Sequence, residues 1–111
     1  MKNDNQMFSK LIFWDEAKNE WDKLEGHQRK FVMKALQRIE ENGPNIGDSL
    51  GNKRNVDLSG YRKVKLLKIG VRIVYKIVND EIEVTEIVAI GHRDDEEVYK
   101  IAFDRIKKRN A

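Results

Sequence analysis

The sequence predicts a small α+β domain with the element order β-α-α-β-β-β-α, in which a helical hairpin covers one face of an antiparallel sheet. Two observations lead to this prediction. Apolar residues recur at spacings of three and four between residues 15 and 41, as in amphipathic helices. After Gly60 the spacing changes to two, as in strands. With 111 residues, the chain is expected to form a single domain over 1–111, with residues 1–8 flexible.

The first half is expected to supply one strand and two helices. The apolar run at 10–14 predicts a strand, and Asp15 can cap a following helix that buries Ala17, Trp21 and Leu24. Gly26 is placed to end that helix. A second helix is expected over 27–41, with the buried residues Phe31, Val32, Ala35, Leu36 and Ile39, and it should stop at Asn42-Gly43-Pro44.

The second half is expected to supply three strands and a last helix. Residues 45–60, rich in Gly, Asn, Asp and Ser, predict a long irregular segment suited to partner or substrate contact. Strands are expected at 62–67, 71–78 and 82–90, and their short connections indicate an antiparallel meander. Asp94 with Glu97 resembles a capping box for a helix that continues past Ile106.

Composition excludes several classes of protein. There is no cysteine, so neither a disulfide framework nor a thiolate metal site is expected. Two histidines, His27 and His92, do not suffice for an ordinary zinc site. No apolar run is long enough to cross a bilayer, and no signal pattern opens the chain. We therefore expect a cytoplasmic protein without a metal, another cofactor or a membrane contact.

Charge is sorted along the chain. Residues 61–76 hold six basic side chains and no acidic one, whereas residues 79–97 hold eight acidic side chains and one basic one. By strand alternation, two pairs of cations should share the sheet face opposite the helical hairpin: Lys63 with Lys65, and Arg72 with Lys76. Arg93 follows the last strand and Tyr99 lies in the last helix, so both could reach the rim. The pattern favours a solvated strand face or an anion-binding surface.

The chemistry of this face is compatible with RNA cleavage. There is no Ser-His-Asp or Cys-His set, Gly-rich phosphate loop or metal-ligand cluster. RNA supplies its own nucleophile, the 2′-hydroxyl, and arginine or lysine can stabilise the charge that develops on the phosphate. A lysine with a pKa lowered by cationic neighbours, or a tyrosine, could move protons. From the residues alone, an enzyme is as plausible as a surface that binds RNA or acidic peptides.

Several motifs in order resemble one known family. They are Tyr61-Arg62-Lys63-Val64-Lys65-Leu66, Gly70-Val71-Arg72-Ile73-Val74-Tyr75, Ile90-Gly91-His92-Arg93-Asp94 and Glu97-Val98-Tyr99. Together with the Trp14–Ala17 and Glu20-Trp21 region, this set is similar to the RelE branch of the RelE/ParE toxin superfamily over nearly the whole chain. The expected order of elements also matches that family.

The resemblance implies an endoribonuclease toxin of a type II toxin–antitoxin system that cleaves messenger RNA in the ribosomal A site. The family's catalytic positions fall on Lys63, Lys65, Arg72, Arg93 and Tyr99, and Arg62, Lys68 and Lys76 are candidates for further RNA or ribosome contacts. An antitoxin, the ribosome and mRNA are the implied partners, with operator DNA contacted only through the antitoxin complex. Cleavage would need no metal.

The sequence leaves two alternatives open. One is a ParE-like toxin that inhibits DNA gyrase without catalysis, and the other is an inactive homologue that only binds an antitoxin. The acidic run at 94–97 departs from a purely cationic site. It either weakens RNA binding or favours the positive end of the last helix.

Overall fold

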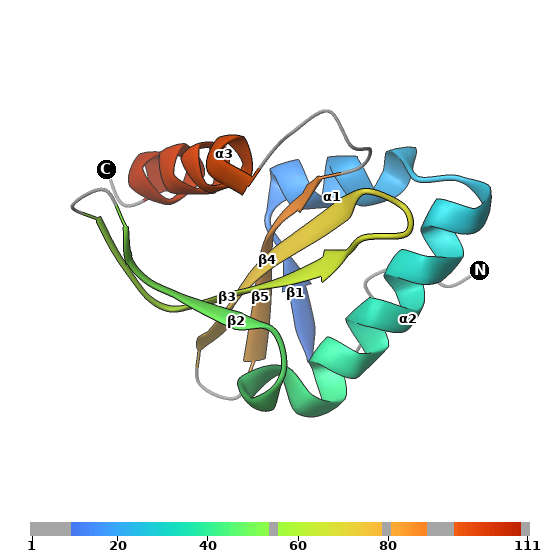
Figure 1. The fold of residues 1–111 in the computed structure, drawn as a ribbon, viewed down its shortest axis with the longest axis horizontal. Coiled ribbons are helices and arrows are strands. Elements are labelled where there is room, and N and C mark those ends of the chain that lie inside the picture. Colours follow the sequence, from blue (N-terminus) through green and yellow to red (C-terminus); the bar gives the residue numbers. More distant parts are fainter. Residues whose placement is uncertain (1–9, 54–55, 79–80, 89–94, 110–111) are drawn as a thin grey trace.

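A computed structural model describes residues 10–53, 56–78, 81–88 and 95–109, which form two helical layers around a sheet (Figure 1). The helices are α1 (Asp15–Lys23), α2 (Gly26–Asn42) and α3 (Asp95–Arg109), with a short 3-10 helix η2 (Gly43–Asn45) directly after α2. The strands are β1 (Leu11–Phe13), β2 (Asp48–Lys53), β3 (Val56–Leu66), β4 (Val71–Val78) and β5 (Glu81–Val88).

The strands form one five-stranded sheet in the order β1-β5-β4-β3-β2. The expected antiparallel meander is confirmed, since β4 pairs antiparallel with both β3 and β5. The sheet as a whole is mixed, however, because β1 pairs parallel with β5. Parallel neighbours require a long crossover. The helical hairpin lies within the connection that follows β1, and the first strand and the last strand are neighbours in the sheet.

The prediction of an irregular segment at 45–60 was wrong. This stretch contains the last residue of η2, the whole of β2 and the first part of β3, and the two strands form an antiparallel hairpin at the sheet edge. An edge strand can be polar, because its backbone needs a partner on one side only. The register shifts between Ser49 and Gly51, and Gly51 has a φ of 59°. A bulge of this kind interrupts the period of two and conceals the strand in the sequence.

The helix boundaries follow the prediction with small differences. Asp15 is the first residue of α1 rather than its cap; Trp14 holds the cap position and makes no side-chain capping bond. The helix ends at Lys23, and Gly26, with a φ of 55°, instead begins α2. The cap predicted at Asp94 and the last two residues of the predicted strand 82–90 lie outside the described residues.

The main core lies between the helical hairpin and the sheet. Trp21 from α1, Leu36 and Ile39 from α2, and Ile73 and Tyr75 from β4 are fully buried in it. Burial of Phe31 was predicted and is wrong, because its side chain is 42% exposed. The buried stripe of α2 consists of Val32, Ala35, Leu36 and Ile39.

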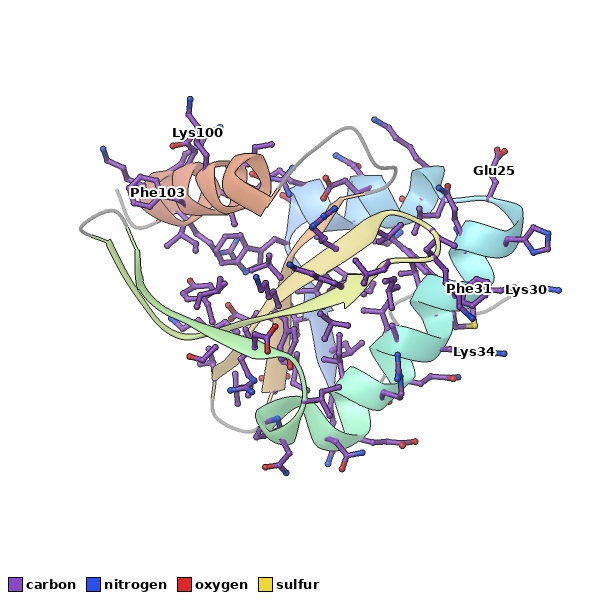
Figure 2. The ribbon with its side chains drawn as sticks, in the orientation of Figure 1. Glu25, Lys30, Phe31, Lys34, Lys100 and Phe103 are labelled. Atoms are coloured by element: carbon purple, nitrogen blue, oxygen red, sulfur yellow. The ribbon has the colours of Figure 1, made fainter. Side chains whose placement is uncertain are left out.

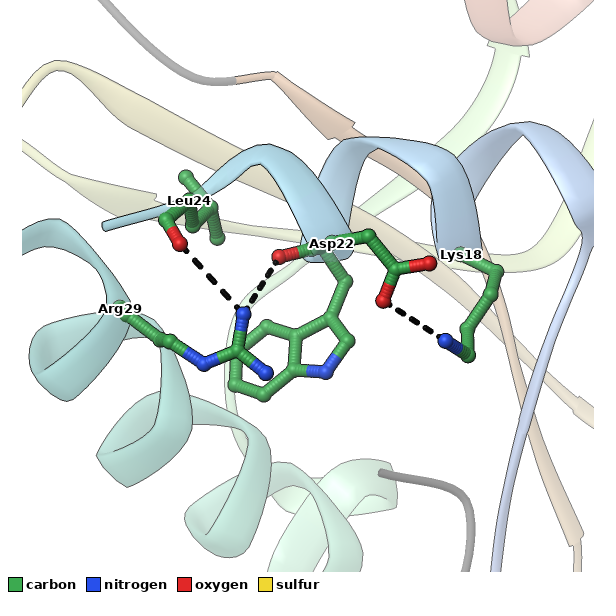
Figure 3. A network of polar contacts seen from close by, with 5 residues as sticks. Lys18, Asp22, Leu24 and Arg29 are labelled. Atoms are coloured by element: carbon green, nitrogen blue, oxygen red, sulfur yellow. Dashed lines mark hydrogen bonds and ion pairs between the residues drawn. The ribbon is translucent and has the colours of Figure 1, made fainter. Parts of the chain in front are cut away.

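Arg29 joins the two helices of the hairpin (Figure 3). Its Nη1 donates to the backbone oxygens of Trp21 at 3.1 Å and Leu24 at 3.4 Å. The guanidinium also lies 4.2 Å from the centroid of the Trp21 ring. One side chain of α2 therefore bonds two backbone carbonyl groups at the carboxyl end of α1, and it adds a cation–π contact with Trp21.

A second, smaller apolar cluster lies on the other face of the sheet. It contains Ala102 and Ile106 of α3, packed with residues of the sheet and its border: Trp14, Leu50, Tyr61 and Val74. Arg105 of α3 also pairs with Glu20 of α1, with Nη1 and Oε1 3.0 Å apart. The expectation of an open face opposite the hairpin therefore needs correction, because α3 covers one part of it.

Candidate functional site

Three of the predicted site residues come together on the β3–β4 hairpin. Lys65 lies directly opposite Arg72, and Lys63 lies opposite Val74. Val64 and Leu66, which alternate with the two lysines, pack against the main core. Lys63, Lys65 and Arg72 consequently project from the sheet face opposite the helical hairpin, as strand alternation predicted.

The electrostatics of this cluster suit an anion. Lys65 is exposed, whereas Lys63 and Arg72 are half-buried. Side chains directly opposite each other in an antiparallel pair have Cβ atoms about 5 Å apart, and like charges at that separation repel. An anion bound beside Lys65 and Arg72 would relieve this repulsion, while Lys63 also has Asp48 of β2 as its cross-strand neighbour. We refer to Lys63, Lys65 and Arg72 as the cationic cluster.

Lys68 extends the same end of the hairpin. It is exposed in the turn that connects β3 to β4, close in sequence to both Lys65 and Arg72. The neighbouring Leu67 is 78% exposed, the most exposed large apolar side chain of the described residues. The turn therefore presents one cation and one apolar group beside the cationic cluster.

Arg62 and Lys76 make structural contacts that sequence reasoning missed. Arg62 lies on the other face of β3, where its Nε donates to the backbone oxygen of Ile46 at 2.7 Å and its Nη2 to that of Gly47 at 2.9 Å. Lys76 lies at the far end of β4, with its Nζ 5.0 Å from the centroid of the Tyr61 ring. Arg62 therefore lies on the face opposite the cationic cluster, whereas Lys76 lies on the same face as the cluster, in the next residue pair on that face beyond Lys63 and Val74.

Tyr61 is the register partner of Lys76 and is itself buried. Burial raises the pKa of its phenol, the carboxylate of Glu83 raises it further, and the guanidinium of Arg109 acts in the opposite direction. A tyrosine with a raised pKa stays protonated at neutral pH, so Tyr61 is suited to packing and to donating a hydrogen bond rather than to accepting a proton.

The remaining two predicted residues belong to the last part of the chain. Tyr99 lies in α3, three residues before the Ala102 that packs on this sheet face. Arg93 lies outside the described residues. The helix that carries Tyr99 therefore borders the face that carries the cationic cluster.

A groove on the other side of β3 adds an arginine that the sequence analysis did not single out. The groove has a volume of about 330 Å³ and is lined by Ala35, Arg38, Ile46, Gly47, Asp48, Lys63, Val64 and Lys65. Arg38 is exposed on α2, and Asp48 is the β2 residue directly opposite Lys63. In the sequence, Arg38 is only a basic residue on the polar side of a predicted helix, and such a residue alone does not indicate a site.

Gly47 sets the position of the backbone at Lys63. Its φ is 71°, and a Cβ built on it would lie 2.4 Å from the backbone oxygen of Lys63. We expect Gly47→Ala to destabilise the fold by about 2 kcal/mol or more, because left-handed strain adds to a backbone clash. Urea unfolding measures this loss.

Gly51→Ala is the matched control for that substitution. Gly51 also has a positive φ, 59°, but a Cβ there would meet nothing within 4 Å. It should therefore show the strain of about 1 kcal/mol alone. Equal losses for the two variants would contradict a role of Gly47 in close packing against Lys63.

The described residues contain no group of three His, Cys, Asp or Glu side chains able to hold a metal ion. Among the same residues, no helix is long and apolar enough to cross a membrane.

The chain shares its architecture with small toxins whose structures are solved. The crystal structure of the isolated RelE toxin of E. coli matches with a TM-score of 0.59 and 28% identity, covering 86% of this chain and 96% of that one. The E. coli RelBE toxin–antitoxin complex matches with a TM-score of 0.57 and 27% identity, covering 72% of this chain and 94% of the matched one. These likenesses confirm the predicted fold class, that of RelE-type toxins.

Sequence comparison identifies the family. The model of the ParE toxin of type II toxin–antitoxin systems matches residues 11–97. The chain is also 33% identical over 96 residues to the mRNA interferase toxin RelE of E. coli K12, covering 86% of this chain and 95% of that protein. The chain therefore belongs to the ParE toxin family and is a RelE-type member of the RelE/ParE superfamily.

Proposed function

We propose that this toxin is a metal-independent endoribonuclease that cleaves messenger RNA in the A site of the ribosome. The observation that carries the proposal is the cationic cluster: Lys63, Lys65 and Arg72 share one sheet face, with Lys65 and Arg72 directly opposite each other. The 33% identity to a protein named mRNA interferase supports it.

The reaction uses the substrate's own nucleophile. The 2′-hydroxyl oxygen bonds to the adjacent phosphorus while the bond from phosphorus to the 5′ oxygen breaks. The 2′-hydroxyl gives its proton to a base, and the leaving 5′ oxygen takes one up. The products are a 2′,3′-cyclic phosphate and a 5′-hydroxyl, and the cyclic phosphate can open to a 3′-phosphate.

Each proposed residue has a part in this reaction. Lys63 and Lys65 orient the phosphate and assist removal of the 2′ proton, and Arg72 stabilises the negative charge that develops on the phosphate oxygens. Further roles are proposed for Arg93, near the leaving group, and for Tyr99, which stacks on a base or shares in proton transfer. Arginine and lysine here take the charge-stabilising part that a metal ion has in other nucleases.

Dependence on the ribosome follows from the openness of the site. Attack by the 2′-hydroxyl requires the 2′ oxygen, the phosphorus and the leaving 5′ oxygen to be in line. A small sheet face does not hold a flexible RNA strand in that geometry. The ribosome supplies that orientation by fixing the codon in the A site, and fixed geometry is worth several powers of ten in rate.

An antitoxin would silence the toxin by covering the same face. RelE of E. coli has been crystallised in complex with the antitoxin RelB. An acidic extended strand or amphipathic helix laid over the cationic cluster would neutralise it and exclude RNA. Contact with operator DNA is proposed only through such a complex.

Primer extension on a defined mRNA tests the proposed activity. The mRNA is programmed into purified ribosomes and incubated with the toxin in the presence of a metal chelator at a concentration that leaves the ribosomes intact. We expect new stops within A-site codons that appear only when ribosomes are present. Stops that arise equally in free mRNA, or no stops at all, would contradict the proposal.

Inhibition of DNA gyrase is the second candidate, because the matching family model is that of ParE toxins. A supercoiling assay with the same protein preparation distinguishes the two. Inhibition of supercoiling without mRNA cleavage would replace the nuclease with this function.

A further inference from the structure

The exposed side of α2 carries a row of cations with one aromatic residue. Lys30, Lys34 and Arg38 are spaced four residues apart and are exposed, and Phe31 beside them is 42% exposed. At 1.5 Å per residue the row is about 12 Å long. Figure 2 shows Lys30, Phe31 and Lys34 pointing away from the body of the domain. We call Lys30, Phe31, Lys34 and Arg38 the α2 stripe.

The charge of the α2 stripe is not compensated locally. Between Glu25 and Glu40 the helix contains no acidic residue. Within the described parts of the chain, Lys30, Lys34 and Arg38 form no ion pair with a carboxylate. Aligned cations of this kind attract a polyanion and release its counterions when they bind.

The α2 stripe is continuous with the surroundings of the cationic cluster. Arg38 ends the row and lines the groove of about 330 Å³ together with Lys63 and Lys65. The residues that line the groove include the bases Arg38, Lys63 and Lys65 and the single acid Asp48. Basic residues therefore lie on both sides of β3, in the cationic cluster on one face and along α2 on the other.

The stripe suits RNA better than an acidic protein. Protein interfaces are poor in lysine and need a central apolar area, yet Phe31 is the single large apolar side chain exposed on the described part of α2. The hollow around it is small, about 100 Å³, and is lined by His27, Lys30, Phe31 and Lys34. An aromatic ring flanked by cations can stack on an unpaired base while the cations hold phosphates.

The position of α2 selects which RNA is bound. The helix packs on the sheet face opposite the one from which the cationic cluster projects, so one short strand of message in the cluster does not also follow α2. We propose that the α2 stripe binds the phosphate backbone of ribosomal RNA and docks the toxin while the cationic cluster holds the message. This inference rests on the proposed function and adds a second RNA-binding surface to it.

Binding to vacant ribosomes, without mRNA, tests the α2 stripe apart from catalysis. We expect Lys30→Gln/Lys34→Gln to bind roughly tenfold more weakly at ~0.1 M salt. The slope of log Kd against log salt concentration should fall by about two, one for each lysine removed. Phe31→Ala should weaken binding about fivefold with the salt dependence unchanged, because stacking releases no counterions. The rate of cleavage at saturating ribosomes should stay that of the wild type.

Lys23→Gln/Lys107→Gln is the matched control, because it removes two exposed lysines from α1 and α3. It should bind ribosomes as the wild type does. Equal losses in both double variants, or none in either, would overturn the inference. The inference would also be overturned if Lys30→Gln/Lys34→Gln bound ribosomes normally but no longer bound poly-glutamate, because the α2 stripe would then be a protein-binding face. A wild type that binds vacant ribosomes through the stripe but cuts no mRNA would contradict the proposed nuclease and leave the docking surface in place.

Discussion

Arg72→Ala is expected to lower ribosome-dependent cleavage of mRNA roughly a hundred- to a thousandfold. Removal of one preorganised donor to a developing negative charge has an effect of this size, and Arg72 lies directly opposite Lys65 in the proposed site. The loss should appear in the single-turnover rate at saturating ribosomes. Primer extension along a time course measures it.

Two comparisons make the Arg72 result specific. Arg72→Lys keeps the charge but loses the planar pair of donors, so its rate should fall between those of the wild type and Arg72→Ala. Lys23→Ala removes an exposed cation from α1 and should cleave normally. Thermal unfolding should be similar for all of them, because the Arg72 side chain is only half-buried. Cleavage by Arg72→Ala at the wild-type rate would remove Arg72 from the catalytic assignment.

Trp21→Ala is expected to cause the largest loss of stability among single substitutions in the helical hairpin, about 4 kcal/mol. The Trp21 side chain is fully buried between α1, α2 and the sheet. Its removal opens a cavity and also takes away the ring on which Arg29 stacks. Urea unfolding followed by circular dichroism measures the loss without relying on tryptophan fluorescence.

Phe31→Ala is the control for that experiment. Both substitutions remove an aromatic side chain from the hairpin, but Phe31 is 42% exposed. Its loss should cost less than about 1 kcal/mol, because little apolar surface returns to water. Similar losses for the two variants would contradict the burial that separates them.

Elements with a clear apolar period were predictable from sequence. The stripe of Val32, Ala35, Leu36 and Ile39 predicted α2, and β-branched residues predicted β4. The strand β2 was missed because Gly51 and the bulge break its alternation, and because the backbone of β3 supplies its pairing. Phe31 was assigned to the core because sequence spacing defines a helix face only to within about one residue.

The cationic cluster was predictable for a similar reason. Lys63, Lys65 and Arg72 alternate with core residues within single strands, so strand period alone assigns their face. Arg38 was missed because it reaches the groove from another element, across the edge of β3. The cover that α3 provides through Ala102 and Ile106 likewise depends on contacts between residues far apart in sequence.

The parallel pairing of β1 with β5 has a consequence for the time at which the toxin becomes complete during synthesis. Leu11 is the register partner of Ile82, and Phe13 that of Val84. When β1 leaves the ribosome, its neighbour β5 has not yet been made. The two strands can pair only after some seventy further residues have been translated. Contacts this distant in sequence form late and slowly. We therefore expect the sheet that carries the β3–β4 hairpin to be complete only after β5 has been made, when most of the chain has been translated.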